Sequence, residues 1–434
     1  MTRPRIPLWS QARALAERTP PSRNRTADFL RAASIGAVVL GHWLLAAPQV
    51  LGTSLLVGHM LEIAPWTRWL TWGFQVMPVF FVVGGYSNGA SWAAARARGG
   101  SYAAWLDVRL RRLVVPVVPL IATWAAIAVA ARQLGVGPLS VQVGSQTALV
   151  PVWFLAVYVL VVVLVPVTHA AWRRWGIASF WVLAAVALAI DAAWFSGLRF
   201  LGWANYLFVW TAVHQLGYLW RDGRLAGPRR ALPWAAGGGA LLAALVAWGP
   251  YPPSMVGVPG EELSNTLPPK LPMLALGALQ AGLLLSLEAP LGRCLRRGGA
   301  WTLTVLVNGM IMTIYLWHLT ALALAIAAAF LLGGVGLHSQ PGSAAWWLAR
   351  PVWLLAAAAA LVPLALAFGR FERAGAPAAG PSPPAWRLVT GAALVCAGLA
   401  FAALLGVGAD HALGVRLWVV LTPLAGATLI VLRA

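Results

Sequence analysis

Acidic residues are scarce in this sequence, and charged residues of any kind are few. Only 11 aspartates and glutamates stand against 31 lysines and arginines, and charged residues make up 10% of the 434 positions. Soluble globular domains carry about 25% charged residues, so this scarcity excludes an ordinary soluble protein. With 60% of its residues hydrophobic, the chain is predicted to be a polytopic membrane protein.

Cysteine is nearly absent, and the common cofactor motifs are missing. The two cysteines, Cys294 and Cys396, fall in a predicted cytoplasmic loop and a predicted membrane segment, so no disulfide framework is expected. The sequence has no metal-binding cluster, P-loop or dinucleotide fingerprint, and we predict no metal and no bound cofactor. A net charge of +20 would suggest nucleic-acid binding in a soluble protein. In a membrane protein the position of each charge matters more, and we predict no nucleic-acid partner.

The sequence is rich in apolar runs of about 20 residues, the length that crosses about 30 Å of hydrocarbon in a lipid bilayer. About twelve such runs predict an all-α, polytopic bundle of transmembrane helices. They cover residues 28–49, 69–94, 113–133, 149–171, 176–196, 203–220, 231–249, 270–288, 302–333, 346–369, 386–407 and 413–432. The ninth is long enough to be tilted, kinked or broken.

Basic residues are divided unevenly between the two sides of the predicted bundle. Cytoplasmic loops of membrane proteins carry an excess of lysine and arginine. With the N-terminus inside, most basic residues are cytoplasmic, and the outer side keeps Arg68, Arg132, Arg199, Lys270, Arg350 and Arg416. Both termini are therefore predicted to be cytoplasmic, in a multi-pass protein of the cell inner (plasma) membrane.

The composition divides the chain into four parts. Residues 1–23 are a basic cytoplasmic tail, and residues 24–369 are a membrane core of ten predicted helices. Residues 370–385 are rich in proline, glycine and small residues, which is typical of a flexible linker. Residues 386–434 hold the last two predicted helices, which carry few polar groups and form an additional hairpin.

Three ionisable residues occur in the first apolar run, DFLRAASIGAVVLGHW. Such groups are costly in a bilayer unless they are paired or face a polar cavity. The step from Arg31 to His42 is three helical turns plus about 20°, or roughly 16 Å along one face. Asp28 falls on the same face. The three side chains predict a polar stripe that runs from the cytoplasmic edge toward the membrane midplane.

The stripe permits more than one role for its residues. Histidine titrates near neutral pH, so His42 can accept the proton of an attacking hydroxyl group, as acyl transfer requires. Spacing alone leaves open a histidine that only bridges helices by hydrogen bonds. Arg31 can bind a phosphate or carboxylate, or it can be a cytoplasmic anchor paired with Asp28.

Five motifs occur in a fixed order along the chain. They are Arg31 with ten residues and then His42, MPVFFVVGGYSNG (77–89), RLRRLVVP (109–116), PVWFL (151–155) and IYLWH (314–318). Together they resemble the acyltransferase-3 family of integral membrane acyltransferases, over roughly residues 24 to 369. Family members often have serine and glycine where this chain has Gly84 and Gly85, so no role for that serine is carried over.

The resemblance implies that His42 is the catalytic histidine and that Arg31 is functional, with Asp28 orienting it. It also makes Arg109 and Arg112 the best site for the phosphates of a CoA donor. Their R-x-x-R spacing puts two guanidinium groups on one helical face. Without the resemblance, these arginines would be explained by topology.

Five further residues complete the predicted site. Tyr86 and Asn88 lie toward the cytoplasmic end of the second segment and are expected to line the donor path. His318 follows Tyr315 by three residues, on the same face, and is expected to share a cavity with His42. Asn308 is a candidate cavity-lining residue, although hydrogen bonding between helices is the simpler explanation.

These residues predict an integral membrane O-acyltransferase. The resemblance implies that it moves an acyl group, most simply acetyl, from the co-substrate acyl-CoA in the cytoplasm to a hydroxyl of a glycan, glycolipid or other carbohydrate-containing or lipid-linked acceptor, with His42 as general base. The alternative is a transporter or flippase without acyl chemistry. Carriers usually place paired carboxylates at the midplane, where this chain has few acids. A sensor of acyl-modified lipids that binds without turnover is a second alternative.

Overall fold

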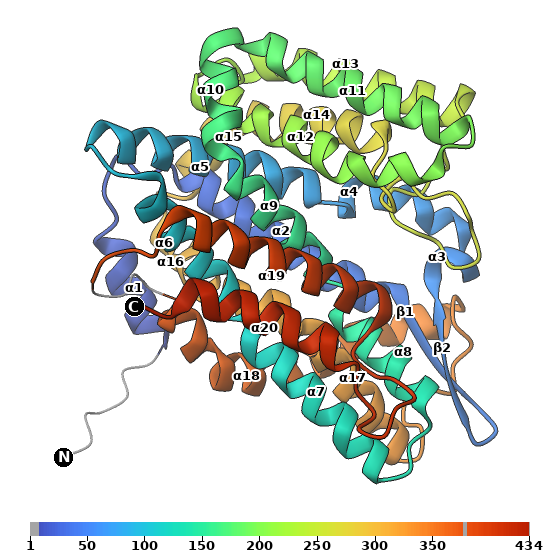
Figure 1. The fold of residues 1–434 in the computed structure, drawn as a ribbon. Helices are drawn as coiled ribbons and strands as arrows, with labels where there is room; N and C mark the ends of the chain where they lie inside the picture. The colour runs from blue at the N-terminus through green and yellow to red at the C-terminus, as the bar shows by residue number, and fades with distance from the viewer. Residues whose placement is uncertain (1–7, 376–379, 434) are drawn as a thin grey trace. The chain divides into compact units, whose positions relative to one another are not determined.

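The computed structural model describes residues 8–375 and 380–433, which are mostly helical (Figure 1). The chain forms two compact units. The first contains residues up to 38, 68–91 and 167–311, and the second contains 39–67, 92–166 and the chain from 312 onward. Helices α2 and α5 contribute residues to both units.

The elements follow one another as short and long helices interrupted by one β-hairpin. The first half holds α1 (Leu8–Glu17), α2 (Arg25–Leu45), β1 (Ala46–Leu51), β2 (Ser54–His59), α3 (Met60–Ile63), η1 (Pro65–Leu70), α4 (Thr71–Phe74), α5 (Met77–Ala97), α6 (Tyr102–Val114), α7 (Val117–Gln133), α8 (Pro138–Leu149), α9 (Val152–Val163), α10 (Val165–Trp175), α11 (Ile177–Phe195) and η2 (Arg199–Ala204). The second half holds α12 (Asn205–Arg221), α13 (Pro228–Trp248), α14 (Leu271–Ser286), α15 (Glu288–Cys294), α16 (Gly298–Asn308), α17 (Ile311–Leu331), α18 (Ala344–Ala374), α19 (Ala385–Leu405) and α20 (Leu417–Val431).

Several of these helices are suited to crossing a membrane. By length and composition, seven candidates occur in the described residues, and two bent pairs raise the number to nine. The pairs are α8 with α9, bent by 46°, and α14 with α15, bent by 53°. Each of the twelve predicted segments contains helix. The chain is therefore a multi-pass helical membrane protein, while the number of crossings and the cytoplasmic position of both termini stay predictions.

A β-hairpin corrects the all-α prediction. Strands β1 and β2 pair antiparallel directly after α2, so the first helix ends at Leu45 instead of continuing to residue 49. Pro48 explains the ending, because proline lacks an N–H donor and disfavours helix in the residue before it. Gly52 has a φ of 61° at the two-residue turn between the strands, which glycine adopts without strain.

The long ninth segment is broken into two helices. Helix α16 ends at Asn308 and α17 begins at Ile311, with Gly309 between them. In the first unit, α16 packs against α1. Asn308, before the break, lies in the first unit. Tyr315 and His318, after the break, lie in the second.

Glycine permits close helix packing in the first unit. Helices α13 and α14 pack along their length. A Cβ atom on Gly238 would lie 2.6 Å from the backbone nitrogen of Leu279, and one on Gly282 would lie 2.3 Å from that of Ala235. Small residues let helices approach in this way where lipid offers no hydrophobic driving force.

The C-terminal hairpin, α19 and α20, is packed into the second unit. Its two helices touch at Gly398, where a Cβ atom would lie 2.3 Å from Cδ of Pro423. Helix α19 also packs against α6, α8 and α9, and α20 packs against α6 and α7. The Sγ atom of Cys396 donates to the carbonyl of Ala156 on α9. The hairpin predicted as an addition thus shares the apolar core of the second unit.

Candidate active site

Two histidines from distant parts of the sequence meet in the second unit. Nε2 of His318 on α17 lies 3.0 Å from Nδ1 of His42 on α2, and the ring centroids are 5.0 Å apart. His318 is fully buried, and His42 is half-buried. Trp43 donates its indole N–H to the backbone carbonyl of His318 at 3.0 Å. The expected proximity of the two histidines therefore takes the form of a direct hydrogen bond.

The backbone sets the tautomers of this pair. Nδ1 of His318 lies 2.6 Å from the carbonyl oxygen of Tyr315, and a carbonyl only accepts, so Nδ1 of His318 carries the proton. A charged imidazole buried without a counter-ion is costly, so we assign a neutral ring. Nε2 of His318 is then an acceptor, and Nδ1 of His42 must donate to it. The lone pair of His42 is left on Nε2.

Two of the motifs meet beside the histidines. The Tyr315 hydroxyl donates to the carbonyl of Pro151, the first residue of PVWFL. The Tyr315 ring also meets Phe154 edge-on, with centroids 5.7 Å apart. Tyr315 is 3% exposed. These contacts fix the turn of α17 that presents His318.

Glu372, a residue that sequence reasoning missed, caps the same helix. From the last turn of α18, its Oε1 accepts from the backbone N–H of Met312 at 3.2 Å. Its Oε2 accepts from the backbone N–H and the hydroxyl of Thr313, at 3.1 and 2.9 Å. A carboxylate at a helix N-terminus satisfies donors that have no partner within the helix and complements its dipole. Glu372 thereby anchors α17 below Tyr315 and His318.

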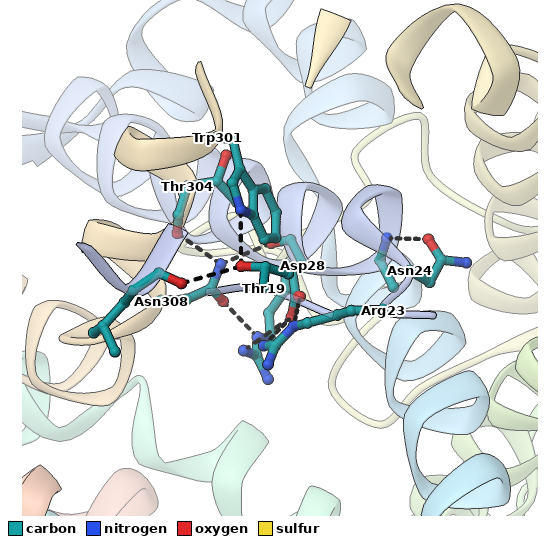
Figure 2. A network of polar contacts seen from close by, with 10 residues as sticks. Thr19, Arg23, Asn24, Asp28, Trp301, Thr304 and Asn308 are labelled. Atoms are coloured by element: carbon teal, nitrogen blue, oxygen red, sulfur yellow. Dashed lines mark hydrogen bonds and ion pairs between the residues drawn. The ribbon is translucent and has the colours of Figure 1, made fainter. Parts of the chain in front are cut away.

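Asp28 and Asn308 belong to a polar network in the first unit, shown in Figure 2, and Arg31 contacts both residues. Nε of Arg31 donates to Oδ1 of Asn308 at 2.7 Å, and Nη2 of Arg31 lies 3.6 Å from Asp28. The Asn308 amide donates to the backbone carbonyls of Asp28 and Thr304, both at 2.9 Å. Asn308 thus forms hydrogen bonds between helices, the simpler of the two roles considered for it. The Arg31 side chain is 38% exposed.

Arg23 is a second residue that sequence reasoning assigned only to the basic tail. Its Nε and Nη2 atoms donate to the two carboxylate oxygens of Asp28, at 2.5 and 3.1 Å (Figure 2). These hydrogen bonds raise the pKa of Arg23 above its ordinary value. Asp28 therefore binds Arg23 more closely than Arg31, and the predicted pairing of Arg31 with Asp28 is present beside it, at 3.6 Å.

The arginines of RLRRLVVP lie on α6 in the second unit. Arg109 is half-buried, with its guanidinium 5.8 Å from the ring centroid of Trp105, and Arg112 is exposed. Arg111, between them, is buried and pairs with Asp107 at 2.9 Å. Arg109 and Arg112, the predicted R-x-x-R pair, therefore lie on a different side of α6 from the buried ion pair of Arg111 and Asp107.

Tyr86 and Asn88 lie where α5 meets α12, in the first unit. A Cβ atom on Gly85 would lie 1.8 Å from the carbonyl oxygen of His214, so the two backbones approach closely. The Asn88 amide donates to Nε2 of His214 at 3.2 Å, with both side chains buried. Tyr86 packs on Trp220 with ring centroids 4.3 Å apart. These contacts are structural, and the role of both residues toward a donor stays a prediction.

Several helices have the length and composition to cross a membrane, and two of them, α2 and α17, carry the histidine pair. In the described residues, no three His, Cys, Asp or Glu side chains gather as a metal site would require. The chain belongs to the acyltransferase-3 family, because the family model described as an acyltransferase domain matches residues 24–370. It is a membrane acyltransferase, as the five motifs predicted. Neither a curated protein nor a solved structure matches the chain.

The cap formed by Glu372 gives a first prediction. Glu372→Ala removes all three acceptor contacts at the start of α17, and a lost helix cap costs about 0.5–2 kcal/mol. Thermal unfolding of the detergent-solubilised variant is expected at a lower temperature, with faster amide exchange at Met312 and Thr313. Glu372→Gln keeps one acceptor oxygen and should fall between the alanine variant and the parent. Equal stability and equal exchange in all three proteins would contradict a capping role.

Proposed function

We propose that this protein is an integral membrane O-acyltransferase of the cell inner (plasma) membrane. It takes an acyl group, most simply acetyl, from cytoplasmic acyl-CoA and transfers it to a hydroxyl of a glycan, glycolipid or glycosylated acceptor. Membership of the family supports acyl transfer in a membrane. The donor class, the acceptor type and His42 as the base are what the family resemblance implies, and the polar stripe and the basic residues of α6 are consistent with them.

The His42–His318 hydrogen bond carries the proposal. Its chain of donors runs from Nδ1 of His42 to Nε2 of His318, and from Nδ1 of His318 to the Tyr315 carbonyl. This arrangement fixes the His42 ring and leaves the lone pair on Nε2, as a general base needs. When His42 takes up a proton, His318 stabilises the charge through the same hydrogen bond. His318 is therefore a positioning residue, and His42 is the catalytic one.

The reaction is an ordinary acyl transfer. Nε2 of His42 removes the proton of the acceptor hydroxyl while the oxygen attacks the thioester carbonyl carbon. The new C–O bond forms, the C–S bond of the tetrahedral intermediate breaks, and CoA leaves as a thiolate. The His42 imidazolium returns its proton to that thiolate. The products are the O-acylated acceptor and CoA, and the His42 ring is neutral again.

Arg109 and Arg112 are the proposed contacts for the CoA phosphates. Their guanidinium groups lie three residues apart on α6, one half-buried and one exposed. Arginine donates two parallel hydrogen bonds to phosphate, which gives both affinity and orientation. Arg31 and Asp28 remain predicted catalytic residues; their contacts with Asn308 and Arg23 also anchor the first turns of α2.

The role of His42 as a base is tested by two substitutions. His42→Ala and His42→Gln are both expected to lose at least about nine-tenths of the transfer, since a positioned base contributes about 10²–10⁴-fold. The glutamine amide can still donate to Nε2 of His318, so this variant keeps the helix contact and lacks only the base. The measurement is radiolabelled acetyl moved from acetyl-CoA into the glycolipid and polysaccharide fractions of expressing cells.

His338→Ala is the control, because His338 is exposed in a loop, where its Nε2 lies 3.3 Å from the carbonyl oxygen of Gly333. It should transfer acetyl at the parental rate. More than a tenth of parental activity in His42→Gln would remove His42 from the catalytic role. A transporter, a flippase or a sensor that binds without turnover would release no CoA even in the parent protein.

Donor binding gives a separate prediction. Arg109→Ala combined with Arg112→Ala should raise the apparent KM for acetyl-CoA by about tenfold or more, because hydrogen bonds to charged groups contribute about 1.5–3 kcal/mol each. The KM for the acceptor should change little. Both constants are measured in membrane vesicles that hold the endogenous acceptor.

Arg96→Ala with Arg98→Ala is the matched control, since it removes the same charge from the exposed stretch before α6. This control should leave the acetyl-CoA KM near its parental value. An equal rise of the acetyl-CoA KM in both double variants would show that the effect depends only on net charge. An equal rise of the KM for acetyl-CoA and for the acceptor would refute donor binding by Arg109 and Arg112.

A further inference from the structure

The four charged residues of α6 lie on two sides of the helix and differ in exposure. At about 100° per residue, Asp107 and Arg111 lie about 40° apart. Arg109 and Arg112 lie about 60° apart on the opposite side. Among these four charged residues exposure follows the division, because Asp107 and Arg111 are 2% and 4% exposed, whereas Arg109 is half-buried and Arg112 is exposed.

Residues near the C-terminus bind the two buried charged residues of α6. Oδ1 of Asp107 accepts from Nε of Arg111 at 2.9 Å, and Oδ2 accepts from Nη2 of Arg433 at 3.0 Å. Arg111 also donates to the carbonyl of Val431, at the end of α20. Nη1 of Arg433 donates to the carbonyl of Gly380 at 3.0 Å. One buried carboxylate therefore joins two guanidinium groups, one from α6 and one from the C-terminus.

A second segment touches the same turn of α6. Gly375 follows α18, and a Cβ atom on it would lie 3.0 Å from the carbonyl oxygen of Arg111 and 3.2 Å from Cα of Arg112. Only a residue without a side chain fits this approach comfortably. Gly375 and Arg433 both lie beyond residue 370, where the family match ends.

We propose that Arg433 is a positioning residue for donor binding: through Asp107 it fixes the rotation of α6 and so the direction of Arg109 and Arg112. The proposal rests on the proposed role of these two arginines in holding acyl-CoA. A buried carboxylate that accepts hydrogen bonds from two guanidinium groups is held in one orientation, because losing either partner leaves a buried charge poorly paired. Because two-pronged phosphate recognition depends on orientation, a small rotation of α6 weakens it. The C-terminal hairpin thereby becomes part of the donor site.

The test compares Arg433→Gln with Arg416→Gln in the full-length protein. Arg416 is a matched control, because it also binds backbone carbonyls of the hairpin, those of Leu405 and Gly408, at the end where the two helices are joined. The readouts are the Kd for acetyl-CoA, measured by titration calorimetry on the solubilised protein, and hydrogen–deuterium exchange of residues 102–114. Thermal unfolding of each variant is recorded beside them.

Arg433→Gln should weaken acetyl-CoA binding about tenfold, the loss of roughly one charge-assisted contact, and should accelerate exchange in α6. Arg433→Lys can still donate to Asp107 and should recover part of the affinity. Arg416→Gln should leave both readouts at parental values, even if it unfolds at a lower temperature.

Parental affinity in Arg433→Gln, with or without faster exchange in α6, would overturn the positioning role. Equal weakening in Arg416→Gln would also overturn it, since general loosening of the hairpin would then be sufficient. A parent protein that fails to bind acetyl-CoA, while Arg433→Gln still accelerates exchange in α6, would instead refute the proposed donor site and leave the structural clamp in place.

Discussion

The hydrogen bond between His42 and His318 is the contact on which the rest of the candidate site depends. It joins two residues that are 276 positions apart in the sequence. Because the Tyr315 carbonyl fixes the His318 ring, the lone pair of His42 is assigned to its Nε2. The supporting contacts all act on the helix that carries His318. Tyr315 ties α17 to Pro151, Trp43 binds the His318 carbonyl, and Glu372 caps the start of the helix. Polar groups on membrane helices need such partners, because lipid offers no water to satisfy them.

The scarcity of acidic residues has a structural counterpart. Four of the few acids each accept several hydrogen bonds. Asp28 binds Arg23 through both oxygens, and Asp107 joins two arginines. Asp191 accepts from Tyr251, Asn205 and the backbone of Leu271, and Glu372 accepts three donors at α17. An unpaired carboxylate is expensive in a membrane. Asp107, Asp191 and Glu372 obtain their partners by joining segments distant in the sequence, whereas Asp28 obtains its partner from the residues just before α2.

The sequence was sufficient to predict apolar helices and the family, and it suggested that His42 and His318 face a shared cavity, whereas the structure shows the two rings in direct contact. Periodicity and hydropathy identify apolar helices because lipid imposes one length and one polarity on all of them. The partners of polar residues were harder to predict. The pairing of Arg31 with Asp28, one of the predicted alternatives, is present at 3.6 Å, but the shorter contact of Arg31, with Asn308 on another helix, was not predicted. Such choices depend on how neighbouring helices are rotated, and a single sequence carries no record of that rotation.

The remaining surprises have local causes. Pro48 and Gly52 turn a predicted helix end into a hairpin, and Gly309 precedes the start of α17 within the long ninth segment. The link from Arg433 to Asp107 had no sequence signal, because a lone arginine at the C-terminus is also what the positive-inside rule expects. Its function emerges only when α6 and the end of α20 are seen packed together.

The most direct test of the central claim is solid-state NMR of the protein in lipid bilayers with ¹⁵N-labelled histidine. The signals of His42 are assigned by their loss in His42→Gln. The geometry predicts that His42 carries its proton on Nδ1, with a hydrogen bond detected to Nε2 of His318, and that its own Nε2 is unprotonated at neutral pH. A His42 protonated at Nε2, or two histidine rings without a hydrogen bond between them, would contradict the assignment of His42 as the base.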